Sequence, residues 1–299
     1  MNEVFGKKEE DELKLSYEQS KRNKLDRTMM DEKDLNEYHS IGKPIKWSTK
    51  YSYVTGTRHE DHGTRSYDVN GSRLPSVTTI LGATKNQQFL KDWKAKVGEQ
   101  EADRIKNLSS KRGTSMHKFL EHYVQGTGYD DLTELGQKAK AMAQKVIDVG
   151  LTPVEEIYGS EVTLYYPGLY AGSTDLVCVH NGMDTVVDFK QANRPKREDW
   201  IEDYFMQIGA YAMAHDYVHK SEIKQGVVMI CTPDLYYQEF KIQGAELRSW
   251  KHKFLKRLDM YHELKFDEKE AVDIDLPQLE KEMTVKDWKK LHKELKDER

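Results

Sequence analysis

Only two cysteines, Cys178 and Cys231, occur in the 299-residue sequence. A disulfide framework is therefore excluded, and such sparse cysteine fits a reducing compartment. No apolar run approaches the roughly 20 residues that a membrane-spanning helix needs. The first residues lack an apolar signal core and hold too many acidic side chains for a transit peptide. We therefore expect a cytoplasmic protein with no membrane partner.

Neither sign of charge predominates, since 47 Lys and Arg residues stand against 51 Asp and Glu residues, for a net charge of -4. This balance neither favours nor excludes a nucleic-acid partner, because basic side chains can gather in one groove. An apolar content of 37% is sufficient for a core in a chain of this length. The sequence has no zinc-finger spacing and no recognition helix, so we do not expect it to read specific duplex sequences.

Three segments differ in composition. Residues 1–40 are dense in charge and poor in apolar side chains, which predicts a charged tail or helix. Residues 41–265 carry the patterns of a folded domain, and residues 266–299 resemble a charged helical extension. For the charged ends we hypothesise docking of a partner, such as a replication or recombination protein.

Helices alternate with groups of strands in the predicted secondary structure. Short antiparallel strands are expected around a turn at Asn70-Gly71. Ser109 or Ser110 is the expected N-cap of the second helix, and Gly150 ends the third. The order of elements predicts an α/β or α+β fold with helices around one mixed sheet. The expected helices cover residues 79–106, 110–124, 133–149, 198–218 and a region from 248 onward, and the expected later strands lie within 161–190, 226–232 and 236–242.

A hairpin turn at Asn181-Gly182 brings two acidic residues together. Asn-Gly between two strand-like runs is a strong hairpin signal, and a turn centred on it sets Asp188 opposite Asp175. Side chains alternate along a strand, so Lys190 shares the face of Asp188, whereas Val187 and Phe189 point to the other face. The hairpin therefore predicts a patch of two carboxylates and one ammonium group.

Like charges that face each other destabilise a sheet, so this pair of aspartates calls for a compensating cation. A hard divalent metal ion supplies it, and Mg²⁺ suits one or two carboxylates, water and phosphate oxygens. Lys190 could orient or deprotonate an attacking water, or offset charge that develops on a phosphate. The alternative is a solvent-facing strand on which Asp188 and Lys190 are ordinary surface charges.

Three motifs resemble those of a known nuclease superfamily. Asp175 followed by the "DFK" of residues 188–190 resembles the PD-(D/E)xK motif. "RGTSMHKFLE" at residues 112–121 resembles the histidine-bearing helix of RecB-type nucleases, and "QIGAY" at residues 207–211 resembles their Q-x-x-x-Y element. The wider sequence is similar to the mitochondrial genome maintenance exonuclease branch and its phage and bacterial relatives.

The resemblance implies a restriction-endonuclease-like core, with a mixed sheet flanked by helices, and a set of site residues. Lys190 would be the catalytic lysine, acting with Asp175 and Asp188. Glu121, Gln207 and Tyr211 would support the site. Some RecB-type nucleases carry an iron-sulfur cluster on four cysteines, but two cysteines cannot supply that cage, so we expect none. The implied ligands of Mg²⁺ or Mn²⁺ are His117, Asp175, Asp188 and the backbone carbonyl of Phe189.

Helical spacing is compatible with these roles. His117 and Glu121 lie four residues apart and share a helix face, from which a neutral imidazole can reach a metal on the hairpin. Glu121 could equally orient His117 or lie at the surface. Gln207 and Tyr211 are also four residues apart, on a helix whose expected core residues are Trp200, Tyr204, Ile208 and Ala212.

DNA contacts are expected from basic side chains near the catalytic strand, because phosphate binding draws on Lys and Arg. Trp93 could stack on an unpaired base, although an aromatic residue at this position could equally be buried. The expected phosphate contacts are Arg112, Arg194, Lys196 and Arg197.

These features predict an Mg²⁺- or Mn²⁺-dependent DNA exonuclease that acts on single-stranded ends or flaps in replication, recombination or DNA turnover. A phage origin is compatible with the resemblance, in which case the site of action is the host cytoplasm. Two alternatives stay open at this stage: a structure-selective endonuclease of the same fold, and a DNA-binding module that has lost cleavage.

Overall fold

The computed structural model describes residues 45–61 and 63–270. The predicted tail at residues 1–40 lies outside this part of the chain, as does the predicted extension beyond residue 270. Within the described residues, no helix is both long and apolar enough to cross a membrane.

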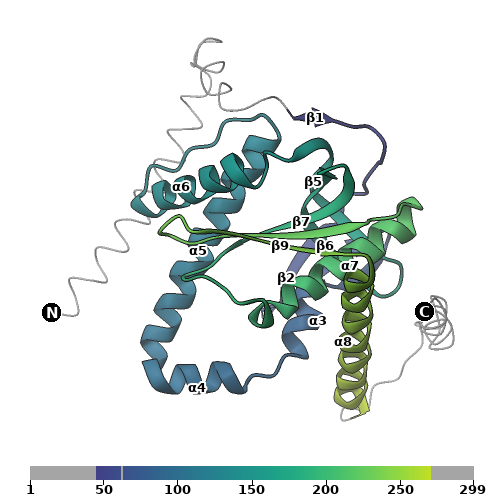
Figure 1. Cartoon of the computed structure of the whole chain (residues 1–299). Coiled ribbons are helices and arrows are strands. Elements are labelled where there is room, and N and C mark those ends of the chain that lie inside the picture. The colour runs from purple at the N-terminus through teal and green to yellow at the C-terminus, as the bar shows by residue number, and fades with distance from the viewer. Residues whose placement is uncertain (1–44, 62, 271–299) are drawn as a thin grey trace.

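A six-stranded sheet forms the centre of the molecule (Figure 1). Its strand order is β1-β5-β6-β7-β8-β9, in which β1 and β5 are parallel, β7 and β8 are parallel, and the other neighbours are antiparallel. The expected mixed sheet is therefore confirmed. Its strands are β1 (Lys46–Trp47), β5 (Val154–Tyr166), β6 (Tyr170–His180), β7 (Met183–Gln191), β8 (Gln225–Cys231) and β9 (Tyr237–Gln243).

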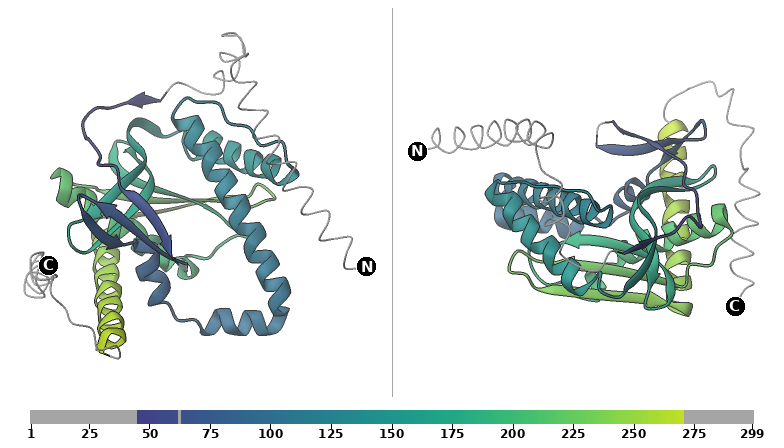
Figure 2. Two further views of the ribbon diagram at one scale, coloured as in Figure 1. Left: turned by 180° about the vertical axis from the view of Figure 1, so that it is seen from behind. Right: turned by 90° about the horizontal axis from the view of Figure 1, so that it is seen from above.

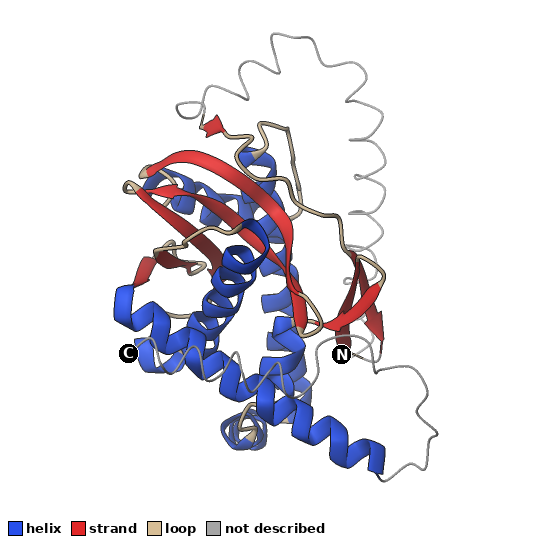
Figure 3. Ribbon diagram, turned by 90° about the vertical axis from the view of Figure 1, so that its right-hand side faces the viewer, coloured by secondary structure: helices blue, strands red, loops and turns tan. Residues whose placement is uncertain are grey.

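Helices cover both faces of this sheet (Figure 3). One apolar cluster joins α5 (Glu99–Val124) and α6 (Glu134–Val149) to side chains such as Val187 and Phe189 of β7. The other joins α7 (Glu202–His219) and α8 (Gly244–Glu270) to the opposite face, which includes Val186. Successive residues of β7 thus enter different clusters, as the alternation of side chains along a strand requires.

A second, three-stranded antiparallel sheet packs against β6 and precedes the first helices (Figure 2). The predicted turn at Asn70-Gly71 joins two of its strands, and both residues have positive φ angles, 51° and 82°. This small sheet leads the chain through two short helices into α5. Its strands and these helices are β2 (Thr57–Asp61), β3 (Thr64–Val69), β4 (Ser72–Pro75), α3 (Val77–Ala83) and α4 (Gln88–Val97).

The helix boundaries differ from the predicted ones before α6. The expected helix at residues 79–106 is divided among α3, α4 and the start of α5. α3 ends with Thr84 as its C-cap, and Gly98, with a φ of 86°, turns the chain between α4 and α5. α5 then continues without a break to Val124, so Ser109 and Ser110 lie inside a helix and cap nothing. For α6 the prediction is close, since Thr133 is its N-cap and Gly150 its C-cap.

Trp200 was expected in the core but is 52% exposed. A short 3-10 turn, η1 (Glu198–Trp200), precedes α7, and the buried face of α7 begins only after it. Ile208 and Ala212 are buried as expected, and Tyr204 is partly buried against the same cluster.

Candidate functional site

The β6–β7 hairpin positions the acidic residues. Asn181 and Gly182 have φ angles of 51° and 73°, as the tight turn requires, and the pairing runs from His180↔Met183 to Leu176↔Val187 in the predicted register. The next pair would be Asp175 and Asp188, but the strands separate there.

Asp175 closes the hairpin at this point with its side chain. Its Oδ2 atom accepts a hydrogen bond of 2.6 Å from the backbone N–H of Phe189. Where the two strands separate, the Asp175 carboxylate thus accepts the hydrogen bond that a backbone carbonyl would accept in a continuous ladder. The Asp175 carboxylate is consequently held beside the strand that carries Asp188.

Asp188 and Lys190 form a buried ion pair on the α7 side of the sheet. The Lys190 Nζ atom lies 2.7 Å from Oδ1 and 2.6 Å from Oδ2 of Asp188, and the Asp188 side chain is only 2% exposed. Oδ2 accepts no hydrogen bond of good geometry within the described residues. Burial, followed by the charge of Asp175, raises the pKa of Asp188 to about 6 against the opposing effect of Lys190.

α5 brings His117 to the same place from the other face of the sheet. Its Nδ1 atom lies 3.2 Å from Oδ1 of Asp175. Burial opposes charge on either group, but their mutual attraction outweighs it, so the pKa of His117 is raised and that of Asp175 is lowered. The two oxygens of Asp175 therefore face different partners, His117 and the backbone of Phe189.

Glu161 of β5 completes a cluster that the motifs did not indicate. One ligand atom from each of His117, Glu161 and Asp175 lies within 4.8 Å of the others. In the β5–β6 register, Glu161 falls opposite Asp175, between the pairs Ser160↔Leu176 and Val162↔Thr174. Desolvation and the charge of Asp175 raise the pKa of Glu161 to about 7.

A sequence signal for Glu161 does exist in the β5–β6 turn. Tyr166 pairs with Tyr170 around Pro167-Gly168, where Gly168 has a φ of 73°. A three-residue loop, Pro167-Gly168-Leu169, sets Glu161 opposite Asp175, whereas a two-residue turn centred on Pro167-Gly168 would set Ser160 there.

Gln207 and Tyr211 lie buried on α7, behind the acidic residues. The Gln207 Nε2 atom donates a hydrogen bond of 3.3 Å to the Tyr211 hydroxyl. A Cβ atom at Gly172 would lie 2.8 Å from that hydroxyl, so the tyrosine fills space that only a glycine of β6 leaves. Nearer the hairpin, the ring of Tyr204 lies 5.1 Å from Lys190 Nζ.

Glu121 lies on α5, one turn beyond His117, and is not among the three side chains whose ligand atoms converge. Its Oε1 atom accepts a hydrogen bond of 3.2 Å from Gln125 Nε2, one turn further along α5. Its negative charge is among the influences that raise the pKa of Glu161. Glu121 thus acts on the cluster through space, and its supporting role stays a prediction.

The residues expected to contact DNA are placed in different ways. Arg112 is only 7% exposed and donates hydrogen bonds to the side chains of Gln191 and Asn193, so it fastens α5 to the end of β7. Its expected contact with a phosphate stays a prediction. Arg194, Lys196 and Arg197 follow in the loop after β7, and Trp93 is half-buried on α4.

The donor set fits a hard divalent cation. Two carboxylates and an imidazole converge within reach of one ion, and the buried Asp188 Oδ2 has unused acceptor capacity beside them. Mg²⁺ and Mn²⁺ prefer oxygen ligands to thiolates. Within the described residues this is the one group of three or more such side chains able to hold a metal ion.

Two solved structures are similar to parts of the chain. A candidate exonuclease from Eubacterium rectale is 11% identical, with a TM-score of 0.39, over 56% of this chain and 69% of that one. An alkaline exonuclease from Laribacter hongkongensis is 14% identical, with a TM-score of 0.27, over 53% of this chain and 86% of that one. No protein family and no curated protein matches the sequence. Similarity this distant carries no argument about activity, which has to come from the site.

Proposed function

We propose that the protein is a metal-dependent DNA exonuclease that hydrolyses phosphodiester bonds at single-stranded ends or flaps. The observation that carries the proposal is the convergence of Asp175, Asp188 and Lys190 where the β6–β7 hairpin opens, beside His117 and Glu161. Lys190 pairs with the buried Asp188, but the charge of Asp175 still raises the pKa of both Asp188 and Glu161, so carboxylates held this close repel one another unless a further cation joins them. Such a cluster is better explained by a ligand than by stability.

The metal would be held chiefly by His117, Glu161 and Asp175, with Asp188 adjacent. Phe189 supports this assignment through its backbone, because the N–H and C=O of one strand residue point to the same side. Its N–H is bonded to Asp175, so its carbonyl faces the same opening of the hairpin. A divalent cation bound there would polarise the scissile phosphate and lower the pKa of a water molecule.

Lys190 is suited to stabilising charge rather than to accepting a proton. Burial disfavours its ammonium form, but the carboxylates of Asp188 and Asp175 outweigh that effect and raise its pKa. A protonated lysine can orient the attacking water and offset negative charge that develops on the phosphate. Of the roles considered we propose charge stabilisation, because the Lys190 ammonium is held beside the carboxylates by its ion pair with Asp188.

Two other functions are compatible with the same fold and site. A structure-selective endonuclease would use the same residues on a strand without a free end. A DNA-binding module without activity would have no use for facing carboxylates near phosphate, because they repel it. The retained acidic cluster therefore favours an enzyme.

The test is degradation of linear and circular single-stranded DNA with Mg²⁺, with Mn²⁺ and with a chelator. The intact chain should degrade the linear substrate only when a metal is present. Lys190→Ala should lower that rate by at least about 100-fold, since it removes a preorganised charge. Lys138→Ala on α6, which removes a lysine paired with Glu134 on the surface, serves as the matched control and should leave the rate unchanged.

Each outcome decides between the three functions. Cleavage of the circle would establish the endonuclease instead. If duplex ends and both single-stranded substrates stay intact with either metal, the proposal fails and the inactive module is the remaining explanation. Thermal unfolding of Lys190→Ala would show whether a loss of activity reflects a loss of fold.

A further inference from the structure

The loop after β7 holds an exposed aromatic residue close to two arginines. The Trp200 side chain is 52% exposed at the end of η1. The guanidinium carbons of Arg194 and Arg197 lie 5.9 Å and 5.6 Å from the centre of its ring. Both distances are within the range of cation–π attraction. An exposed tryptophan flanked by cations is therefore a fixed feature of this loop.

Two sets of side-chain hydrogen bonds hold the loop in place. The Gln238 side chain of β9 accepts a hydrogen bond of 2.7 Å from the backbone N–H of Lys196 and donates one of 2.9 Å to its carbonyl. Asn193 is bonded in turn to Arg112 and Ser109 of α5. The loop is thus tied to an edge strand on one side and to a helix on the other.

Two cations of this loop, Arg194 and Lys196, form no ion pair in the part of the chain that the structure describes. Arg197 pairs with Asp199 at 2.9 Å, but within the described residues Arg194 has no hydrogen bond or ion pair. Burial, then the like charges of Arg194 and Lys85, lowers the pKa of Lys196, although Lys85 is itself paired with Asp203 at 2.5 Å. The surface is therefore complementary to a polyanion.

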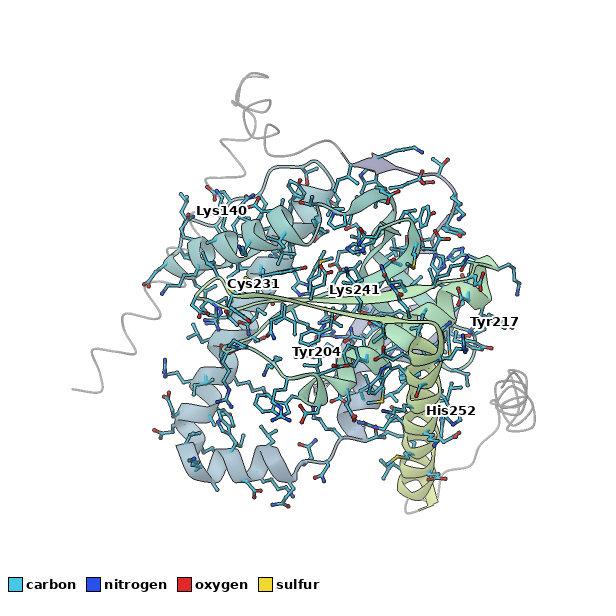
Figure 4. All side chains as sticks on the ribbon, in the orientation of Figure 1. Lys140, Tyr204, Tyr217, Cys231, Lys241 and His252 are labelled. Carbon is cyan, nitrogen blue, oxygen red and sulfur yellow. The ribbon has the colours of Figure 1, made fainter. Side chains whose placement is uncertain are left out.

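The tryptophan also lies close to the candidate active site along the chain. It precedes Tyr204 by four residues, and Lys190 Nζ lies 5.1 Å from the centre of the Tyr204 ring. Tyr204 is labelled in Figure 4. The loop that carries Trp200 begins directly after β7, the strand of Asp188 and Lys190.

We propose that Trp200, with Arg194, is a stacking platform for an unpaired base of a DNA strand that enters the site. Base–aromatic stacking tolerates any sequence, and the arginine attracts the adjacent phosphate. The role in substrate choice rests on the proposed nuclease function, whereas binding of single strands does not. The platform accounts for a tryptophan that the fold leaves outside its core.

The test is the affinity for a fluorescently labelled oligo(dT) strand, measured by anisotropy at one salt concentration with a chelator to prevent cleavage. Trp200→Ala should weaken binding about 5- to 100-fold, the loss of one stacked base. Trp200→Phe, which keeps an aromatic face, should retain most of the affinity. An abasic strand of equal length, which offers phosphates without bases, should bind the intact chain and Trp200→Ala equally.

Tyr217→Ala is the matched control. Tyr217 is 42% exposed and carries the ammonium of Lys220 4.7 Å from its ring, at the other end of α7 from Tyr204 (Figure 4). Its removal should leave oligo(dT) affinity unchanged. If Trp200→Ala binds oligo(dT) as tightly as the intact chain, or loses equal affinity for both strands, the platform is refuted.

The outcome is independent of catalysis because no metal is present. If binding depends on Trp200 but the protein degrades no DNA, the stacking platform is supported and the proposed nuclease function is refuted. Metal-dependent degradation combined with an unaffected Trp200→Ala variant would do the reverse.

Discussion

The Glu161 carboxylate reaches the metal-site cluster from an unfavourable backbone conformation. Its φ of 52° lies in the left-handed region, which costs a residue other than glycine about 1–3 kcal/mol when the structure imposes it. Its side chain accepts a hydrogen bond of 3.1 Å from Ser173 and stands with His117 and Asp175. Because such strain persists only where neighbouring structure fixes it, the residue is well placed to serve as a ligand.

Replacing Glu161 by glutamine should weaken the binding of Mg²⁺ or Mn²⁺ by at least about tenfold, since it removes one negative ligand while keeping the side-chain shape. Titration calorimetry of the two proteins measures the difference. Glu156→Gln is the control, because Glu156 lies on the same strand and pairs with Lys46 at the surface. Equal metal affinity in Glu161→Gln and the intact chain would remove Glu161 from the site.

Residues whose positions depend on a local turn were predictable from the sequence. The Asn181-Gly182 turn fixes the facing strands, and so the nearness of Asp175 to the strand of Asp188 follows from it. Trp200 and Arg112 depend instead on where a helix begins and what covers it. The spacing of residues in the sequence alone predicts neither the first residue of a helix nor the burial of a side chain, because tertiary contacts decide both.

At the scale of elements, α7 and α8 approach each other closely at one glycine. A Cβ atom at Gly209 of α7 would lie 2.9 Å from the backbone nitrogen of Lys251 and 3.0 Å from the carbonyl carbon of Trp250, both on α8. Backbone atoms cannot move aside as a flexible side chain can. The contact therefore requires a glycine in the middle of a helix, although glycine disfavours helix by about 1 kcal/mol relative to alanine.

Gly209→Ala should lower the free energy of unfolding by about 1–3 kcal/mol, as overpacking of a tight contact does. Gly82→Ala in α3 is the matched control, since no atom lies within 4 Å of its added Cβ. That control should raise stability by about 0.5–1 kcal/mol through helix propensity. Urea unfolding of the three proteins measures both changes, and a Gly209→Ala variant as stable as the control would contradict the close approach.

Element boundaries show the same division between local and tertiary signals. The expected range of α6 is close to the observed one because Gly150 is a local signal for its end, and Thr133, where the expected helix begins, is its N-cap. α5 was divided at Ser109 in the prediction, yet Ser109 bonds Asn193 across the fold and interrupts nothing. A serine that finds a partner in another element does not end a helix.

At the scale of the whole molecule, the candidate site draws on both faces of the sheet. His117 comes from α5 on one face, whereas Tyr204 and Tyr211 come from α7 on the other. They meet because β6 and β7 separate at Asp175, which opens the sheet between its two helical layers. A local sequence window cannot encode this arrangement, since it depends on the packing of two helices that are about 90 residues apart in the chain.

The segment before β2 is fastened to the far end of α7 by a hydrogen-bond chain that ties stability to pH. Buried His215 lies 3.0 Å from the Tyr53 hydroxyl at Nε2 and 2.6 Å from Ser221 Oγ at Nδ1. The Ser221 hydroxyl donates to Asp216, so Nδ1–H donates to Ser221 and the Tyr53 hydroxyl donates to Nε2. This chain uses the neutral imidazole, and burial followed by the neighbouring His219 lowers the pKa of His215 to about 3.

The pH dependence follows from that lowered pKa. Below the unfolded-state pKa of about 6.5 the unfolded chain takes up a proton at His215 that the folded chain does not, so acid destabilises the fold. Between pH 7.5 and pH 5, this proton uptake at His215 should lower the free energy of unfolding of the intact chain by about 2 kcal/mol. His215→Gln lacks the imidazole and should lose nothing from this cause. Urea unfolding across that range should thus show the stability advantage of the intact chain over the variant shrinking as pH falls. Tyr53→Phe, which loses one hydrogen bond but keeps the imidazole, should retain the slope of the intact chain, and parallel curves for the intact chain and His215→Gln would show that His215 is not buried in its neutral form.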